Sequence, residues 1–369
     1  MLLSAALIVR DEAHHLPDCL ASLEGLVDEV VLVDTGSTDG SPAIARAAGA
    51  RVFEHPWQQD FATARNLGLE RARGCWILYI DADERLRPVE RAELERLLSA
   101  PDVIAFRTWL RPSARATPYR EFRLWRNDPR IRFRRIIHEK VHDAILEVAR
   151  ADGLRIADCD LALDHVGYEG DQTAKHRRNL PLLQAQLREE PTDIYDWHHL
   201  GQVQLALGNE AAAERAFEEA VALARRRSPP DDHGRLAYAD LLRLRQERGE
   251  DVQALATEAL DCYPQDWMLV WIRAAEAIRA GQPQAALPWL DQLVRVDVGA
   301  LPDTVAYDER IFGSAAHAAR GLCLFRLGRY AEATLAYRAA ERLEPEDLEL
   351  QVKRRLAEVR AGGPDHSTG

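Results

Sequence analysis

Residues 75–84 read Cys-Trp-Ile-Leu-Tyr-Ile-Asp-Ala-Asp-Glu, and this stretch decides the fold of the first half of the chain. A continuous apolar run before Asp81 indicates a strand buried on both faces, as inside a parallel sheet. Two carboxylates separated by one residue, Asp81 and Asp83, lie about 7 Å apart along an extended chain. A lone Asp-x-Asp is a weak signal, because aspartate is common where strands end. After a buried strand, however, it suits a hard cation, Mg²⁺ or Mn²⁺, that also binds phosphate oxygens.

The sequence before residue 75 alternates short apolar runs with stretches of helical spacing. The apolar runs are Leu2–Val9, Glu29–Val33 and Arg51–Glu54, and the helical stretches are Leu16–Leu26, Ser41–Ala48 and Phe61–Arg73. This rhythm predicts an α/β, Rossmann-like domain whose parallel sheet is covered on both faces. Ligands bind such sheets outside the carboxyl ends of the strands. The candidate site segments are therefore those that follow strands: Arg10–Glu12, Asp34–Gly40 and Asp81–Glu84.

From about Lys175 onward the strand pattern disappears and a helical repeat takes over. One group of residues has the spacing of a tetratricopeptide unit of about 34 residues: Trp197, Leu200, Gly201, Gly208, Ala213, Phe217 and Ala220. A second unit is formed by Gly321, Gly328, Ala333, Tyr337, Ala340 and Pro345, and two degenerate units lie between them. Small residues let paired helices approach closely, and aromatic residues fill the gaps. The pattern predicts an all-α array.

Composition excludes several classes of protein. Hydrophobic residues make up 47% and charged residues 29% of the 369 residues, which is typical of a soluble globular protein. A net charge of -12 repels a phosphate backbone, so no nucleic acid polymer is expected as a partner. Five scattered cysteines without a Cys-x-x-Cys pair argue against disulfides and zinc. No apolar run approaches the ~20 residues of a transmembrane helix, so we expect a cytoplasmic protein.

Four passages together resemble the family 2 glycosyltransferases of the GT-A fold. They are LIVRDEAHHLPDCLASL (7–23), VDEVVLVDTGSTDGS (27–41), DFATARNLGLERARGCWILYIDADE (60–84) and RIIHEKVHDAI (135–145). They resemble in particular a bacterial subgroup, fused to tetratricopeptide repeats, that includes S-glycosyltransferases and lipopolysaccharide-core enzymes. The expected domains are a GT-A nucleotide-sugar domain over 1–172, the repeats over 173–361 and a disordered tail over 362–369.

The resemblance implies roles for individual residues. Residues that would line the nucleotide pocket, with uridine as the base, are Val9, Asp11, Asp34, Arg65 and Asp81. Residues that would hold the cation at the donor diphosphate are Asp81, Asp83 and His165. Three alternatives stay open: Asp34 and Asp39 cap the following helix, Arg65 is a solvated charge, and His165 is structural. The first strand carries Arg10-Asp11-Glu12, where the family often has a Lys-Asn-Glu type sequence, which leaves the uracil contacts open.

Sugar transfer with inversion also needs a base for the acceptor proton. The resemblance points to Glu139, with His138 as its neighbour or substitute. Glu139 could instead pair with an arginine of the preceding run, and His138 could be a buried core residue.

The predicted function is a metal-dependent hexosyl- or N-acetylhexosaminyltransferase. Its donor would be a nucleotide sugar, with UDP as the expected nucleotide. The acceptor would be a peptide, protein, glycan or lipid held partly by the repeats, which could alternatively form a homodimer. Two rival readings are a scaffold with an inactive nucleotide-binding domain and a nucleotidyltransferase. The second lacks the Gly-rich phosphate loop after the first strand that such enzymes usually have.

Overall fold

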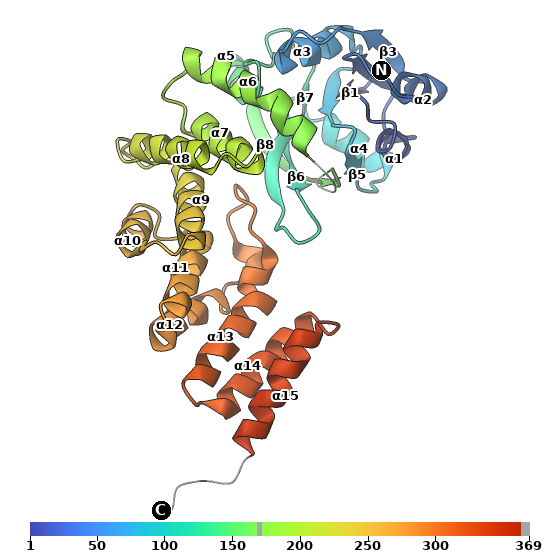
Figure 1. Cartoon of the computed structure of the whole chain (residues 1–369). Helices are drawn as coiled ribbons and strands as arrows, with labels where there is room; N and C mark the ends of the chain where they lie inside the picture. The colour runs from blue at the N-terminus through green and yellow to red at the C-terminus, as the bar shows by residue number, and fades with distance from the viewer. Residues whose placement is uncertain (168–171, 363–369) are drawn as a thin grey trace, which may run out of the picture. The chain divides into compact units, whose positions relative to one another are not determined.

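A computed structural model describes residues 1–167 and 172–362, and it divides the chain into two compact units (Figure 1). Unit 1 comprises Met1–Pro191 together with the short segment Pro302–Ala306. Unit 2 comprises Thr192–Leu301 and the described residues from Tyr307 onward. Most of the expected tail, residues 363–369, lies outside the described residues.

Unit 1 is built on one eight-stranded sheet with the strand order β3-β2-β1-β4-β7-β6-β8-β5. The strands are β1 (Leu3–Val9), β2 (Glu29–Asp34), β3 (Arg51–Glu54), β4 (Trp76–Tyr79), β5 (Glu84–Leu86), β6 (Val103–Arg111), β7 (Tyr119–Arg126) and β8 (Arg155–His165). Strands β3, β2, β1 and β4 are parallel, as the apolar runs predicted. Beyond β4 the sheet is mixed, because β7 is antiparallel to both β4 and β6.

Helices cover both faces of this sheet. The helices of unit 1 are α1 (Leu16–Leu23), α2 (Ser41–Ala47), α3 (Phe61–Arg71), α4 (Arg91–Leu98), α5 (His142–Asp152) and α6 (Thr173–Glu189). Apolar residues of α1, α2 and α4 join one core with β1 and β8, whereas α3 and α5 share the other core with Ile77 and Trp125. The predicted α/β, Rossmann-like fold class is therefore confirmed.

Helix α6 belongs to unit 1, although the sequence places the domain boundary after residue 172. Its residues Leu182, Leu183 and Leu187 are buried, and Gln186 accepts a hydrogen bond from the Ile136 N–H at 3.2 Å. Helical spacing alone does not distinguish a helix that packs on the sheet domain from the first helix of an array.

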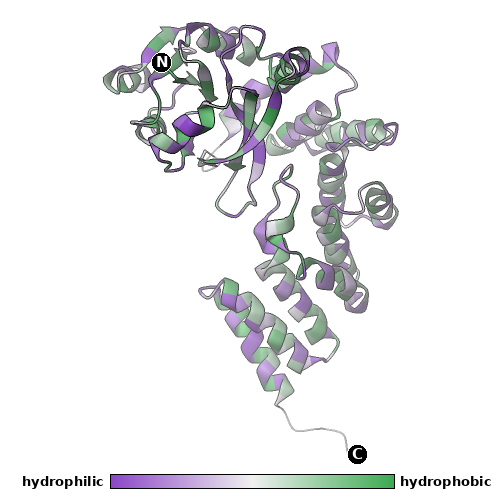
Figure 2. Ribbon diagram, turned by 180° about the vertical axis from the view of Figure 1, so that it is seen from behind, coloured by the Kyte–Doolittle hydropathy of each residue, from purple (hydrophilic) through white to green (hydrophobic). Residues whose placement is uncertain are grey.

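Unit 2 is helical throughout its described part, and Figure 2 shows hydrophobic and hydrophilic residues alternating along its helices. The helices are α7 (Ile194–Ala206), α8 (Glu210–Ala224), α9 (Gly234–Glu247), α10 (Gln253–Cys262), α11 (Trp267–Arg279), α12 (Pro283–Leu293), α13 (Ser314–Arg326), α14 (Tyr330–Leu343) and α15 (Leu348–Ala361), with 3₁₀ turns η1 (Val298–Ala300) and η2 (Glu309–Phe312). The repeat glycines make close contacts: a Cβ added at Gly201 would come within 2.3 Å of Phe217, and one at Gly321 within 2.8 Å of Tyr337. These are the small and aromatic positions of the repeat pattern.

Within the described ranges, none of the helices combines the length and apolar character that spanning a bilayer requires. The cytoplasmic location stays a prediction from the sequence.

Candidate active site

The Asp-x-Asp loop begins where β4 ends and is held by hydrogen bonds on both sides. The Asp81 N–H donates to Glu84 Oε2 at 2.9 Å. The Asp81 carboxylate accepts from Arg65 Nη1 at 3.0 Å and from the Tyr79 hydroxyl at 3.1 Å. These contacts fix Asp81 at the carboxyl end of the parallel strands, where the sequence predicts the ligand site.

Arg65 is a buried bridge between two carboxylates. Its side chain is 9% exposed, so the reading as a solvated helix-face charge is wrong. Its Nε donates to Glu139, and its guanidinium lies 4.4 Å from the ring centre of Tyr79. Burial acts to lower the pKa of Arg65, but Asp81 and Glu139 outweigh it and the pKa is raised. Arg65 thus holds Glu139 beside Asp81. Arg65 lies in α3 and not in the arginine-rich segment that directly precedes Glu139.

Three residues to which the sequence analysis gave no individual role complete this cluster: Tyr79, Glu84 and Arg123. The Arg123 guanidinium lies 4.3 Å from the ring centre of Tyr79 and 2.8 Å from the buried Glu84 carboxylate. Burial raises the pKa of Glu84 to about 7. The positive charge of Arg123 acts to lower this pKa, whereas the negative charge of Asp81 acts to raise it. Arg123 lies in the middle of β7, where only the antiparallel pairing with β4 brings it to this loop. No local pattern in the sequence marks it.

Asp83 and His165 form a second contact on the other side of the loop. Asp83 Oδ2 and His165 Nε2 are 3.2 Å apart. Burial acts to lower the pKa of His165, but its hydrogen bond and ion pair with Asp83 outweigh this and the pKa is raised above 6.5. A Cβ at Gly167 would come within 2.0 Å of the Asp83 carboxylate, so only glycine leaves room for this side chain.

The three predicted metal ligands are not gathered into one set. Among residues 1–167 and 172–362, no cluster of three or more His, Cys, Asp or Glu side chains has an arrangement that could hold a metal ion. The reason is that Asp81 is directed to Arg65 and Tyr79, whereas Asp83 is directed to His165. The donor types, two carboxylates and an imidazole, still suit Mn²⁺ or Mg²⁺. The metal assignment stays a prediction.

The loop after β2 is held by its own acidic residues. Asp34 accepts hydrogen bonds from the Gly36 and Ser37 N–H groups, both at 3.2 Å, so it caps this loop and not helix α2. Asp39 binds the Ser41 N–H at the start of α2, at 2.9 Å. Asp11, with a positive φ of 55°, accepts from the Thr38 N–H at 2.6 Å. The segments Arg10–Glu12 and Asp34–Gly40 are therefore joined by a hydrogen bond.

Two of the predicted nucleotide contacts differ in burial. Val9 is buried in the core, so its side chain is unable to line a pocket, and its carbonyl accepts from the Thr35 N–H at 2.9 Å. Asp11 remains exposed.

The neighbouring Glu12 lies in the predicted site segment Arg10–Glu12, although the sequence analysis gave it no individual role. Burial, followed by the charge of Asp83, raises its pKa to about 7. Its place after the first strand was the available signal.

His138 has a positive φ of 51°. It lies between Arg134 and Lys140, which form an isolated antiparallel bridge. A histidine in the left-handed region marks a constrained turn. This turn presents the following residue, Glu139, to Arg65.

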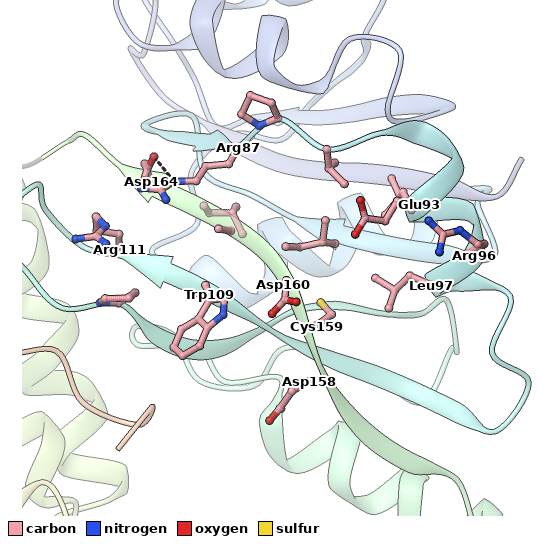
Figure 3. Close-up of a pocket in the computed structure, with 17 residues that line it drawn as sticks. Arg87, Glu93, Arg96, Leu97, Trp109, Arg111, Asp158, Cys159, Asp160 and Asp164 are labelled. Carbon is pink, nitrogen blue, oxygen red and sulfur yellow. Dashed lines mark hydrogen bonds and ion pairs between the residues drawn. The ribbon is translucent and has the colours of Figure 1, made fainter. Parts of the chain in front are cut away.

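A cavity of unit 1 has a volume of about 810 Å³ and lies along α4, β6 and β8 (Figure 3). Its apolar wall includes Leu94, Leu97 and Leu161, and Trp109 and the Arg87–Asp164 ion pair face it. None of the predicted site residues lines it. The cavity is therefore separate from the Asp81 loop, although Asp164 directly precedes His165 in β8.

Comparison with known proteins defines the class of this domain. Residues 4–150 match the model of glycosyl transferase family 2, and residues 197–227 and 314–347 match models of the tetratricopeptide repeat. The N-terminal domain is therefore similar to the family 2 glycosyltransferases, and segments similar to tetratricopeptide repeats follow it.

Two curated relatives combine these features in part. A "TPR repeat-containing protein" of Synechococcus elongatus is 40% identical over 58% of this chain and 55% of its own length. The "lipopolysaccharide core biosynthesis glycosyltransferase LpsC" of Rhizobium meliloti is 36% identical over 39% of this chain and 57% of its own length. The chain thus spans little more than half the length of these relatives.

A solved structure of glucosyl-3-phosphoglycerate synthase from Mycobacterium tuberculosis is 19% identical, and the match covers 51% of this chain and 79% of that chain. Its TM-score of 0.37 is too low to carry a conclusion.

Proposed function

We propose that the chain is a metal-dependent glycosyltransferase that moves a sugar from a nucleotide donor, UDP-linked in the first instance, with inversion at the anomeric carbon. The observation that carries the proposal is the Asp81–Asp83 loop at the end of β4, in a domain that matches the model of glycosyl transferase family 2. This match favours glycosyl transfer over the nucleotidyltransferase hypothesis.

Asp81, Asp83 and His165 are the residues that would hold a divalent cation. The cation would neutralise the charge that develops on the departing diphosphate. The joined segments at Asp11 and Asp34 would border the nucleoside, since both follow parallel strands at the same edge of the sheet.

Glu139 is the proposed base. A nucleophilic atom of the acceptor attacks the anomeric carbon, the bond from this carbon to the diphosphate oxygen breaks with its electron pair, and the acceptor proton passes to the Glu139 carboxylate. Arg65 supports this role because its buried guanidinium holds Glu139 beside Asp81. His138 is the second candidate.

For the acceptor, the proposal names only a chemical class and a place of binding. A cavity of about 810 Å³ falls in the usual range of small-molecule sites, and β8 both lines this cavity and carries His165 of the Asp83–His165 contact. We propose that this cavity takes part of a glycan or peptide acceptor, and that the repeats separately bind large acceptors.

The decisive experiment measures UDP release from UDP-hexoses and UDP-N-acetylhexosamines with Mn²⁺, with Mg²⁺ and with EDTA. We expect release only with a cation, and loss of at least ~10²-fold in Asp83→Asn, because one anionic ligand is removed without a change of shape. Asp102→Asn is the control, since Asp102 is exposed and pairs with Arg155 far from the loop in sequence.

Full activity in EDTA or in Asp83→Asn would remove the metal assignment. A thermal-shift screen with the same donors tests the scaffold reading, because any ligand of the native state raises its stability. A chain that binds no donor and releases no UDP would be a scaffold.

A further inference from the structure

Helix α6 carries two cationic side chains, Lys175 and Arg178, on the side that packs against the rest of unit 1. Together with Leu182 they follow the i, i+3, i+7 spacing of one helix side, and Leu182 is buried. Gln186 continues this side and accepts a hydrogen bond from the Ile136 N–H at 3.2 Å. The two cations therefore extend a packed side of α6 toward its N-terminal end.

Contacts on either side of the two cations hold this end of α6 at the candidate site. Before them, Gln172 Nε2 donates to the Gly167 carbonyl at 3.3 Å, and a Cβ at Gly167 would meet the Asp83 carboxylate. Beyond them, the Arg178 guanidinium lies 5.1 Å from the ring centre of Phe61, the first residue of α3. The first turns of α6 are thus held near the Asp-x-Asp loop and near the helix that carries the buried bridging arginine.

The electrostatic neighbours of the two cations are residues of the candidate site. Burial raises the pKa of Glu12 to about 7, and the charge of Lys175 acts to lower it. Burial, followed by the charge of Arg10, lowers the pKa of Arg178. The charges of Glu12 and Glu139 act on this pKa in the opposite direction. Both cations therefore lie within electrostatic reach of the site carboxylates.

Neither cation is paired with a carboxylate. Among residues 1–167 and 172–362, no Asp or Glu oxygen lies within 4.0 Å of Lys175 Nζ or of the Arg178 guanidinium. Arg178 is only partly exposed, and its Nε donates to the Asn179 side chain at 3.2 Å. By contrast, Arg65 and Arg123 each contact a carboxylate. A partly buried cation without a counter-ion is poorly compensated, and an anionic ligand would neutralise it.

We propose that Lys175 and Arg178 bind the diphosphate group of the donor beside the Asp81–Asp83 loop. This inference rests on the proposed function and names two further residues for it. A guanidinium offers two parallel N–H groups to two phosphate oxygens, and an ammonium adds a compact point charge. The nucleoside and the sugar carry no charge of this kind, so the diphosphate is the part of the donor that fits.

The two cations would also act during transfer. When the bond from the anomeric carbon to the diphosphate oxygen breaks, its electron pair stays on that oxygen. Lys175 and Arg178 would offset the added negative charge without giving or taking a proton. The acceptor proton still passes to the proposed base.

Calorimetry of the full chain with Mg²⁺ tests the proposal with three probes: UDP, inorganic pyrophosphate and uridine. Lys175→Met and Arg178→Met remove the charge and keep an unbranched stem. Each should weaken binding of UDP and of pyrophosphate by about 10- to 100-fold, the worth of a hydrogen bond to a charged group, and leave uridine affinity unchanged. Arg177→Met is the control, since Arg177 is exposed and lies about 100° round the helix from Arg178.

Arg178→Lys separates charge from packing. Lysine keeps the charge but not the planar fork, so it should recover part of the UDP affinity that Arg178→Met loses. If Arg178 only packs on Phe61, Arg178→Met should instead weaken UDP and uridine binding equally, and the lysine variant should restore neither.

Three outcomes would overturn the inference. They are UDP affinity that is unchanged in both methionine variants, equal losses for UDP and uridine, and bound pyrophosphate that UDP does not displace, which would assign the cations to an acidic acceptor. Failure of the proposed donor looks different. A chain that binds neither UDP nor uridine, but binds pyrophosphate through Arg178, would support the diphosphate contact and contradict UDP as the donor nucleotide.

Discussion

At the scale of single residues, the candidate site is organised around one buried arginine. Arg65 contacts Asp81 with Nη1 and Glu139 with Nε, so it joins the proposed metal loop to the proposed base. The planar guanidinium makes both contacts from fixed positions, which a lysine ammonium would not reproduce. The positions of Asp81 and Glu139 therefore both depend on Arg65.

Glu139→Gln tests the base directly. Glutamine keeps the shape and the hydrogen bond from Arg65 but does not take up a proton, so turnover should fall by roughly 10²- to 10⁴-fold. Donor affinity, measured by calorimetry with UDP and Mn²⁺, should change little. Turnover at the rate of the unmodified chain would transfer the role to His138.

Gly167→Ala tests the position of Asp83 without changing any charge. The added methyl would come within 2.0 Å of the Asp83 carboxylate, so this side chain must move away from His165. We expect Mn²⁺-dependent UDP release to fall at least ~10-fold with the fold retained, because displacement of a catalytic group is costly. Gly299→Ala is the control, since its nearest contact is at 3.4 Å. Unchanged release in Gly167→Ala would mean that Asp83 acts from another position.

At the scale of elements, polar contacts join helices α7 and α9 of unit 2. His198 of α7 lies 2.8 Å from Asp240 of α9, which also accepts from Gln202 at 3.0 Å. No local pattern in the sequence marks this partner, which lies 42 residues from His198. Burial opposes ionisation of Asp240, but His198 and Arg243 outweigh it, and the pKa of Asp240 is lowered below 3.8.

The lowered pKa gives this contact a defined pH dependence. Asp240 contributes stability at pH values above its unfolded pKa, and the contribution is lost as the pH falls through its lower folded pKa. Asp240→Asn should therefore lower the free energy of unfolding by ~1–3 kcal/mol at neutral pH. The difference should shrink below about pH 4.

Urea denaturation at a series of pH values measures this difference. Asp232→Asn serves as the control, since Asp232 is exposed in the same unit and should change stability little. A deficit of Asp240→Asn that is the same in acid would contradict a role for the ionised carboxylate.

At the scale of the whole molecule, the two units are interleaved along the chain. Pro302–Ala306 belongs to unit 1, although the repeats precede and follow it in sequence. The Asp303 carbonyl accepts from the Arg120 N–H at 2.6 Å, and its carboxylate lies 3.3 Å from the Arg120 Nε. A chain cut after unit 1 therefore loses a contact to β7 as well as the repeats.

Because Pro302–Ala306 belongs to unit 1, a test of whether the repeats recruit the acceptor must also account for the loss of this segment. A chain of residues 1–191, shown to be folded by circular dichroism, should still act on a small acceptor. It should lose most activity on a large acceptor, because the repeats raise the local concentration of the latter. Asp303→Ala in the full chain is the control for the lost contact and should keep both activities. Equal loss toward both acceptors in 1–191, with Asp303→Ala active, would show that the repeats support the domain and do not recruit substrate.

The sequence by itself determined the parts of this protein that depend on near neighbours. The apolar run that ends in Asp81-Ala82-Asp83 predicted a buried strand followed by an acidic loop, and the glycine and aromatic spacings predicted the repeats. Both follow from periodicity, because the strand and helix repeats fix which side chains share a face.

Only the tertiary structure decided the contacts between distant segments. Arg65 meets Glu139 across 74 residues, Arg123 reaches Glu84 across 39, and Val9 points into the core. The same holds for Pro302–Ala306 in unit 1 and for the exposed apolar residues Leu348, Val352, Leu356 and Val359 of α15, which helical spacing alone would assign to a core. Such contacts depend on how sheet and helices pack, and packing responds to the shape of many side chains at once and not to any local pattern.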